Sequence, residues 1–385
     1  MITIARYARW LLLCALVLFA LTPLCFAQDA SSVVVVKSLT RDADPVIVKG
    51  EQLGLMLGRP IDKLRLYAWR DGKMEPIPFQ IDERDDKGEL CFPLGAEPNA
   101  DLDKGLLDAN DELVFMIGDV GDKVKAEALP ENRRAAMCIV SEDPIDGGKG
   151  YAYVLDFDDP PSPSSMDYVD WIADKRTVRS HIYTIGNTNP EFPALLDFMS
   201  IGSGPSRNIN RLDRFKMRVT ASMLAGKANI TRTEEDVHVR FLSHIDGPVR
   251  VVIKMEFTLT MFMGIQSPSL IRIQTSYGNS SDFPNVVTIP FNIDFLFSNV
   301  NVVSSIDFSE NMAGAKFYNG YNQQGLEIDG KMSEEERRMD LTFRRVDGCG
   351  RRFRGDRCRV FHEREPGAAR YPEPAVLQGR PFRGG

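Results

Sequence analysis

Apolar side chains occupy every second position of residues 249–263, and polar side chains occupy most of the positions between them. This period of two is typical of a β-strand that buries one face and leaves the other in contact with water. Strands usually span about five or six residues, so this run predicts a broad sheet with a large core behind it. We expect the odd-numbered face to build that core, and the even-numbered face, with Arg250 and Lys254, to be solvated.

Similar alternating runs precede and follow this long strand. They cover residues 215–223, 237–241 and 271–277, and Asp246-Gly247 marks a turn into the long strand. Alternating runs that are separated by turn residues predict consecutive antiparallel strands. The sequence therefore predicts an all-β fold with an antiparallel β-sandwich as its second domain, in residues 177–340.

A smaller antiparallel β domain is expected ahead of it, in residues 28–159. Short β-prone runs in this region are divided by turn residues such as Asp71-Gly72, a dipeptide that favours a hairpin. Pro76 and Pro78 lack a backbone N–H, so they predict a strand at the edge of a sheet. Residues 160–176 are rich in proline and serine and predict a linker between the two domains.

The N-terminal residues 1–27 have the features of a Sec signal peptide. Arg6 and Arg9 precede an apolar run, and Cys25-Phe26-Ala27 follows it as a plausible cleavage site. The apolar run is shorter than the roughly 20 residues that a membrane span needs. We therefore expect an exported, periplasmic or extracellular protein with no transmembrane span in the mature chain.

The C-terminal residues 341–385 form a basic tail with eleven arginines, no lysine and five acidic residues. A basic arm, a disordered tail and a frame-shifted end all fit this composition, and the lack of a core-forming pattern favours the last two. Because the net charge is −7 although both ends are basic, the rest of the chain is strongly acidic. That balance argues against nucleic acid as a partner.

Four cysteines lie outside the expected signal peptide: Cys91, Cys138, Cys349 and Cys358. An oxidising compartment would allow them to pair, in more than one connectivity. A zinc site has little support, because no two of them are spaced as C-x-x-C.

Cationic side chains recur on the expected polar face of the central sheet. An arginine fork binds carboxylates, and a nearby histidine can transfer a proton, so such a face suits an anionic sugar such as a uronate. The alternative is the wet side of an antiparallel sheet, where cross-strand charge pairs are stabilising. The candidate ligand-binding residues are Arg218, His238, Arg240, Arg250, Lys254 and Arg272.

An acidic stretch in the first domain resembles a calcium loop of the EF-hand or dockerin kind. Its candidate metal ligands are Asn99, Asp101, Asp103 and Asp108, and side-chain oxygens at alternate positions can converge on Ca²⁺. The pattern departs from those loops, since Lys104 stands where the glycine belongs and no glutamate falls at the twelfth position. A site for a more weakly bound divalent cation and a solvated acidic loop are the alternatives.

No local motif assigns a reaction to this chain. The sequence contains no H-E-x-x-H pattern, no nucleophile elbow and no glycine-rich phosphate loop between a strand and a helix. Catalytic residues are therefore unassigned, and whether the protein is an enzyme stays open.

The turn at residues 246–250 and the strand after it resemble the central sheet of galactose-mutarotase-like supersandwich proteins, which process or bind carbohydrate. Residues 76–83 and 107–115 are similar to the leading β-domain of exported bacterial proteins. The resemblance implies a supersandwich-like second domain and a carbohydrate partner, but the histidine and glutamate of mutarotase-like enzymes have no clear counterpart here.

Together these features predict an exported β-sandwich protein that binds carbohydrate, or also processes it, with an anionic polysaccharide as the ligand. The alternative is a non-enzymatic envelope or extracellular interaction protein. In that case the N-terminal domain would be stabilised by a cation such as Ca²⁺, and the partner would be a cell-envelope component.

Overall fold

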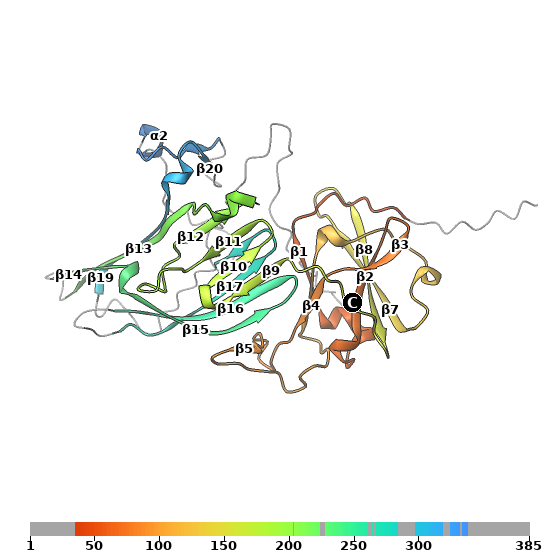
Figure 1. Cartoon of the computed structure of the whole chain (residues 1–385). Coiled ribbons are helices and arrows are strands. Elements are labelled where there is room, and N and C mark those ends of the chain that lie inside the picture. The colour runs from red at the N-terminus through yellow and green to blue at the C-terminus, as the bar shows by residue number, and fades with distance from the viewer. Residues whose placement is uncertain are drawn as a thin grey trace, which may run out of the picture.

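The computed structural model describes residues 35–202, 204–223, 228–260, 264, 266–283, 297–318, 324–331 and 333–337. The expected signal peptide, the basic tail, Cys349 and Cys358 lie outside these residues. Within them, strands form several antiparallel sheets and helical turns are short, so the predicted all-β class is confirmed. Figure 1 shows two β-rich parts side by side, which we call the N-terminal module (residues 35–159) and the C-terminal module (residues 160–337).

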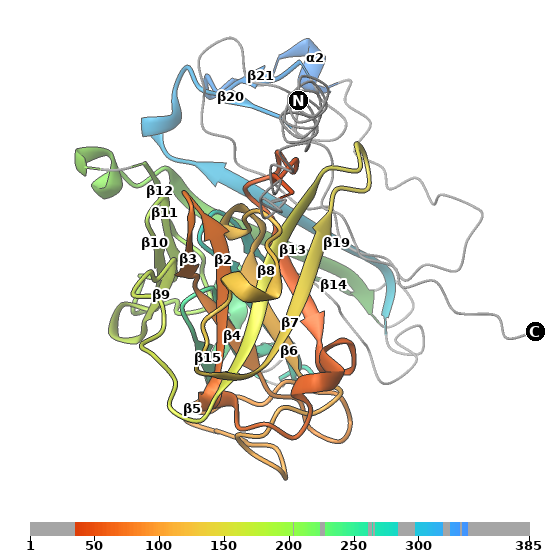
Figure 2. The ribbon, with the colours of Figure 1, turned by 90° about the vertical axis from the view of Figure 1, so that its right-hand side faces the viewer.

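Two antiparallel sheets form the N-terminal module. The first has the order β1-β6-β4, with the bounds Pro45–Lys49, Glu112–Met116 and Phe79–Asp82. The second has the order β3-β2-β8-β7, with the bounds Lys73–Pro76, Leu64–Arg70, Lys149–Phe157 and Arg133–Glu142. Figure 2 views the molecule from the side of this module, with β7 and β8 in front.

The two sheets of the N-terminal module share one hydrophobic core. Leu66, Phe115 and Val154, from β2, β6 and β8, are almost completely buried in it. The prediction drawn from the two prolines is confirmed, because Pro76 ends the edge strand β3 and Pro78 directly precedes the edge strand β4. Proline is tolerated at both places because an edge strand has one side without ladder hydrogen bonds.

A five-stranded antiparallel sheet forms the centre of the C-terminal module, in the order β18-β17-β16-β15-β5. The predicted long strand is β16 (Arg250–Leu259), and it lies in the middle of this sheet. The other bounds are Ser281–Asp282 for β18, Leu270–Tyr277 for β17, Val237–Asp246 for β15 and Leu94–Gly95 for β5. Since β5 comes from the first half of the sequence, the N-terminal module contributes a strand to the sheet of the C-terminal module.

Gly95 allows β5 to approach β15 closely. Its φ is +115°, and a Cβ at this position would lie 2.6 Å from the Cα of Ser243. Only glycine combines this backbone conformation with such an approach at no steric cost. The pairing of Gly95 with Ser243 and of Leu94 with His244 therefore depends on the glycine.

The odd-numbered face of β16 builds core, as predicted. Val251, Ile253 and Met255 are buried and pack against residues such as Val178 and Ile185 of a four-stranded sheet, β12-β11-β10-β9. The bounds of these strands are Phe198–Ile201, Tyr183–Gly186, Thr177–Ser180 and Val169–Ile172. Strand β9 lies within the segment predicted as a linker, so the connection without regular structure between β8 and β9 is residues 158–168.

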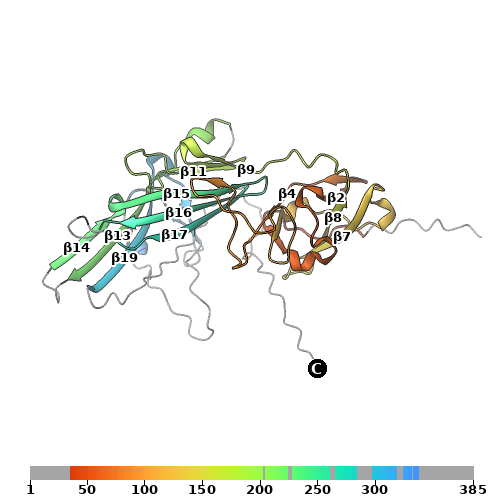
Figure 3. The ribbon, with the colours of Figure 1, turned by 90° about the horizontal axis from the view of Figure 1, so that it is seen from below.

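The remaining sheets complete the C-terminal module, and Figure 3 shows β13, β14 and β19 extending away from the N-terminal module. They are β14-β13-β19 (Ala228–Thr233, Leu212–Met223, Phe297–Phe308) and β20-β21 (Lys316–Phe317, Leu326–Glu327). The supersandwich arrangement of these layers stays a prediction.

Helical segments are short in the part of the chain that the structure describes, with at most seven residues in η1 (Gly50–Met56), and none of these helices is long and apolar enough to cross a membrane. Among the described residues, one turn of α-helix, α2, spans Glu334–Arg337. The other 3-10 turns are η2 (Ile61–Lys63), η3 (Ile117–Asp119), η4 (Ala126–Ala128), η5 (Ala173–Lys175), η6 (Gly204–Asn208), η7 (Glu234–Asp236) and η10 (Glu310–Met312).

Candidate functional site

A buried ion-pair network joins the two modules at the start of β16. Arg250 Nε lies 2.6 Å from Asp82 Oδ2, and Arg250 Nη2 lies 2.7 Å from Glu112 Oε2. Asp82 belongs to β4 and Glu112 to β6, so one side chain of the C-terminal module binds two strands of the N-terminal module. The expectation of a solvated face is wrong at Arg250, which is only 4% exposed because the N-terminal module covers this end of β16.

Opposite charges keep Glu112 and Arg250 ionised despite their burial. Burial alone would raise the pKa of Glu112, but the charges of Arg250 and Arg84 outweigh burial and hold this pKa below its usual value. Burial alone would lower the pKa of Arg250, but Asp82 and Glu112 contribute to raising it. Arg250 therefore contributes to the contact between the modules, where two carboxylates compensate its charge.

Gln80 binds the turn that leads into β16. Its Oε1 accepts hydrogen bonds from the backbone N–H groups of Val249 (3.0 Å) and Arg250 (2.8 Å), and its Nε2 donates to Asp82 Oδ1 (2.8 Å). Gly247 permits this approach, because a Cβ there would lie 2.5 Å from Gln80 Oε1. Two sequence segments that carry the resemblance, 76–83 and 246–250, are thus in direct contact.

The register of the central sheet separates the predicted cationic residues. Residues directly opposite on antiparallel strands project to the same side. Arg240 pairs with Glu256, so Arg240 and His238 lie on the even-numbered side of β16. Arg272 pairs with Met255 and lies on the core side. The expectation that these residues share one face is wrong, because a shift of one residue in register moves every side chain of a strand to the other face.

Two of the cationic candidates are placed away from a common site. Arg218 is exposed on β13, in the three-stranded sheet rather than the central one. Arg240 lies on the central sheet, and its Nε and Nη2 donate to Glu256 Oε2 at 3.0 and 2.9 Å, while its Nη1 donates to Glu97. Two carboxylates therefore compensate the charge of Arg240.

Two further candidates make local contacts. His238 Nε2 lies 2.7 Å from Thr260 Oγ1, and the guanidinium carbon of Arg272 lies 4.6 Å from the ring centroid of Phe257. The second contact is a cation–π interaction across the core side of the sheet. The remaining candidate, Lys254, lies beside a concave surface.

Lys254 lines a hollow of about 390 Å³ between the central sheet and the N-terminal module. Lys254, Ile271 and Ile273 form the wall on the sheet. The opposite wall is formed by Asp85, Lys87, Glu89, Leu90, Phe92 and Asn99. Lys254 and Asn99 were assigned to two separate groups by their sequence patterns, and the fold brings them to one hollow.

The wall from the N-terminal module is a tight hairpin, residues 84–90. Asp85 Oδ1 accepts hydrogen bonds from the backbone N–H groups of Lys87 (3.0 Å) and Glu89 (2.8 Å), so this carboxylate holds the turn. Arg84 and Leu90 form a β-bridge at its base. The rim charges of the hollow are therefore presented by a turn with a defined shape.

Phe92 is one of the residues that line the hollow. It is almost fully buried, and Lys254 Nζ lies 5.6 Å from its ring centroid, within the range of a cation–π contact. Asn99 Oδ1 accepts a hydrogen bond from the backbone N–H of Phe92 (2.9 Å), and Asn99 N donates to the Phe92 carbonyl (2.9 Å). The amide oxygen of Asn99 is thus turned toward Phe92 rather than toward the acidic loop.

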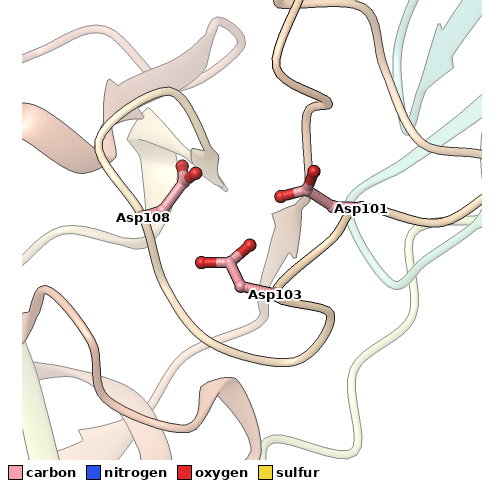
Figure 4. A group of neighbouring side chains, drawn as sticks. All are labelled: Asp101, Asp103 and Asp108. Carbon is pink, nitrogen blue, oxygen red and sulfur yellow. The ribbon is translucent and has the colours of Figure 1, made fainter.

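Three of the four predicted metal-ligating residues converge. The carboxylate oxygens of Asp101, Asp103 and Asp108 lie within 4.8 Å of one another, and Figure 4 shows them facing each other across one loop. Asn99, the fourth candidate, makes the Phe92 contacts described above. The loop therefore brings together three carboxylates, and not the four metal ligands that the sequence pattern predicted.

Crowding and burial change the protonation of this acidic loop. A hydrogen bond with Asp101 raises the pKa of Asp103, and burial raises the pKa of Asp111 to about 6. Asp108 Oδ1 already accepts hydrogen bonds from two backbone N–H groups. The three carboxylates have the chemistry that Ca²⁺ prefers, but they supply fewer than the six to eight oxygen ligands it takes. These residues fit a weakly bound divalent cation better than a high-affinity calcium loop.

Cys91 and Cys138 do not form a disulfide with each other, and both thiols are free among the described residues. Cys91 is buried, and burial raises its pKa to about 11. A thiol that stays protonated at neutral pH is a poor nucleophile, so Cys91 has a packing role.

Sequence reasoning missed Gln80, Asp82 and Glu112, which contact β16 or the turn before it, and Arg84, which binds Glu112. Gln80 and Asp82 alternate along β4 and are both buried. A pair of polar residues on one side of a strand next to an apolar segment is a signal for a polar interface, but their partner lies far away in the sequence. The position of Arg250 as that partner follows only from the fold.

No known protein-family model matches this chain, and no curated protein matches it either. Among solved structures, it is similar to a protein of glycosyl hydrolase family 38 from Enterococcus faecalis, with 8% sequence identity and a TM-score of 0.33. The likeness covers 74% of this chain and 33% of that protein, so the chain spans about one third of its length. A likeness this distant identifies no family, and the expected mutarotase-like relationship gains no support from it.

Proposed function

We propose that this protein binds carbohydrate in the hollow between the hairpin of residues 84–90 and strands β16 and β17. The observation that supports the proposal is the combination of an apolar surface, from Leu90, Ile271 and Ile273, with the polar side chains of Asn99 and Lys254. Sugars present hydroxyl groups beside apolar C–H patches. The volume of about 390 Å³ also falls within the roughly 300–1,000 Å³ of small-molecule sites.

The charge of the hollow supports a neutral sugar better than an anionic polysaccharide. Lys87 and Lys254 are balanced by Asp85 and Glu89 around the same hollow. The arginines that would have gripped a uronate are compensated elsewhere: Arg250 by two buried carboxylates, and Arg240 by two exposed or half-exposed ones. A uronate would therefore meet no excess of positive charge.

Binding is better supported than catalysis. Glycosidases use two carboxylates that flank the bond they cleave, and the carboxylates at the hollow are Asp85 and Glu89, of which Glu89 is exposed on the hairpin. Asp85 already accepts two backbone hydrogen bonds in the hairpin turn. We infer a binding protein that holds a neutral oligosaccharide without cleaving it.

The test is calorimetry with neutral, N-acetylated and uronate oligosaccharides, using the wild type, Lys254→Met and the matched control Lys216→Met. Lys216 is a half-exposed lysine on β13 that pairs with Asp307, away from the hollow. Loss of one charged hydrogen bond should weaken binding of a neutral sugar at least about tenfold in Lys254→Met alone. Absence of binding by the wild type, or equal weakening in both variants, would contradict the proposal. An assay for unsaturated uronate products tests lyase activity in the same samples.

A second candidate function is that of a non-enzymatic envelope or extracellular interaction protein. The convergence of Asp101, Asp103 and Asp108 supports it, because a divalent cation there would stabilise the loop of the N-terminal module. Export through a signal peptide in residues 1–27 is part of both proposals. It is tested by determining the N-terminus of the protein recovered from the periplasm or medium.

A further inference from the structure

The hollow has one wall from each module. Lys254, Ile271 and Ile273 belong to the C-terminal module, whereas residues 85–99 belong to the N-terminal module. The shape of the hollow therefore depends on how the hairpin of residues 84–90 is held against the central sheet. Any group that fixes the hairpin to the contact between the modules also fixes the width of the hollow.

Arg84 makes that connection. Its Nη2 donates to Glu112 Oε1 at 2.7 Å, and its Nη1 donates to the carbonyl of Gly88 at the tip of the hairpin. The other oxygen of Glu112 accepts from Arg250 Nη2 at 2.7 Å. The two arginines thus bind the two oxygens of one carboxylate, and the hairpin tip is linked through Glu112 to β16.

The other contacts of the hairpin hold its shape and its base rather than its tip. The Asp85 carboxylate bonds stay within the turn, as does the bond from Gly88 N to the Asp85 carbonyl (2.8 Å). Asn110 Nδ2 donates to the same carbonyl (3.0 Å), which anchors the base of the hairpin. Among the described residues, the guanidinium of Arg84 bonds both the tip of the hairpin and a carboxylate on another strand, β6.

We propose that Arg84 is a positioning residue of the hollow: through Glu112, it holds the hairpin wall to the same carboxylate that docks the two modules. This inference rests on the proposed function of the hollow. Arg84 does not line the hollow itself, so it acts on a ligand only by placing Lys87, Glu89 and Leu90. Binding of a ligand that touches both walls is then coupled to the docking of the two modules. Ligand binding favours docking by the same factor by which docking favours ligand binding.

The experiment compares Arg84→Gln, Arg84→Lys and Glu112→Gln with the control Arg179→Gln. Arg179 forms a half-exposed pair with Asp170 on β9, remote from the hairpin. Amide hydrogen exchange of residues 85–90 is measured together with binding of the neutral oligosaccharide that binds the wild type best. Exchange of Val154 and Leu155, in the core strand β8, reports general loss of stability.

For Arg84→Gln and Glu112→Gln we expect exchange in residues 85–90 to rise at least about tenfold, as for loss of a hydrogen bond to a charged group. Affinity should fall by a similar factor, and Val154 and Leu155 should keep their protection in Arg84→Gln. In Glu112→Gln their protection should also fall, because this variant removes a buried partner of Arg250. Arg84→Lys should restore the charge beside Glu112 but not the second contact, so its exchange and affinity should lie between those of the wild type and Arg84→Gln.

Unchanged exchange in residues 85–90 overturns the positioning role, and so does faster exchange with unchanged affinity. A wild type that binds no sugar contradicts the proposed function alone, since the exchange measurement still decides whether Arg84 positions the hairpin. Equal effects in Arg179→Gln would mean that the response is general, which also overturns the proposal.

Discussion

Asp82 and Arg250, which are 168 positions apart in the sequence, form a 2.6 Å ion pair whose side chains are 3% and 5% exposed. The pair connects β4 of the N-terminal module to β16 of the C-terminal module. A charge buried at such a place is tolerated only when its partners stay with it. The ion pair therefore couples the stability of each module to its placement against the other. The shape of the hollow between the modules depends on the same placement.

Replacing Arg250 with alanine should destabilise the protein strongly. Asp82 and Glu112 would be left buried without their partner, and breaking a buried pair in this way costs about 3–5 kcal/mol. Urea unfolding at neutral pH measures the loss. The control is Arg179→Ala, which removes a half-exposed pair and should cost at most about 1 kcal/mol. Comparable losses in the two variants would show that the buried ion pairs of Arg250 stabilise the protein no more than a half-exposed pair does.

Gly247→Ala should be destabilising because of Gln80. The new Cβ would lie 2.5 Å from Gln80 Oε1, and overpacking of this kind costs about 1–3 kcal/mol. Gly54→Ala is the control, since a Cβ at Gly54 meets no atom within 4 Å. In a double-mutant cycle, Gln80→Ala should remove most of the penalty at position 247. If the two substitutions are additive, Gln80 is not the cause.

Sequence pattern located the long alternating strands of the central sheet, but it missed β9, which lies in the predicted linker, and it did not assign every face. The alternation in β16 predicted its odd-numbered core face correctly, because the apolar residues Val251, Ile253 and Met255 all lie at odd-numbered positions and therefore on one face. In β17 the alternation of Ile271 and Arg272 showed two faces but not which one meets the core. That choice depends on the register with β16, which no local pattern contains.

The candidate sites show the same limit. Clustering of Asp101, Asp103 and Asp108 was predictable, because near neighbours in a loop meet whatever the rest of the fold does. The burial of Arg250 and the joining of Lys254 to residues 85–99 were not, because both arise from contacts between distant segments. A solvated arginine and a buried one have the same local sequence pattern.

Stability should depend on pH through Asp111. Burial raises its pKa to about 6 in the folded state, above the roughly 3.9 of an unfolded aspartate. The folded state therefore binds the proton more tightly, so this contribution is fully present below about pH 4 and is lost as the pH rises through about 6. As the pH falls from 7 to 4.5, the urea midpoint of the wild type should rise relative to that of Asp111→Asn. A pH-independent difference would rule out Asp111 as the titrating group.

Glu112 should act in the opposite direction and in a more acidic range. Its pKa is held below the usual value, so the stability it confers is present above the unfolded pKa of about 4.3 and is lost as the pH falls through the folded value. The exchange of residues 85–90 should therefore rise below about pH 4 in the wild type. Glu112→Gln should show fast exchange already at neutral pH. Equal profiles for the two proteins would contradict the role of this carboxylate.

A divalent cation should raise the melting temperature if the acidic loop binds one. The cation would compensate the neighbouring negative charges of Asp101 and Asp103. A cation that binds only the folded state raises its stability as the cation concentration rises. Melting is compared in calcium and in chelator for the wild type and for Asp101→Ala/Asp103→Ala. We expect a calcium-dependent rise only in the wild type. An unchanged melting curve would remove the cation from the second candidate function.

The most direct test of the hollow as a carbohydrate site is an exchange footprint with a neutral oligosaccharide. The account predicts added protection in residues 85–92 on one wall and residues 270–274 on the other, both absent in Lys254→Met. Protection confined to the three-stranded sheet of β13, β14 and β19, or no protection under saturating sugar, would contradict it.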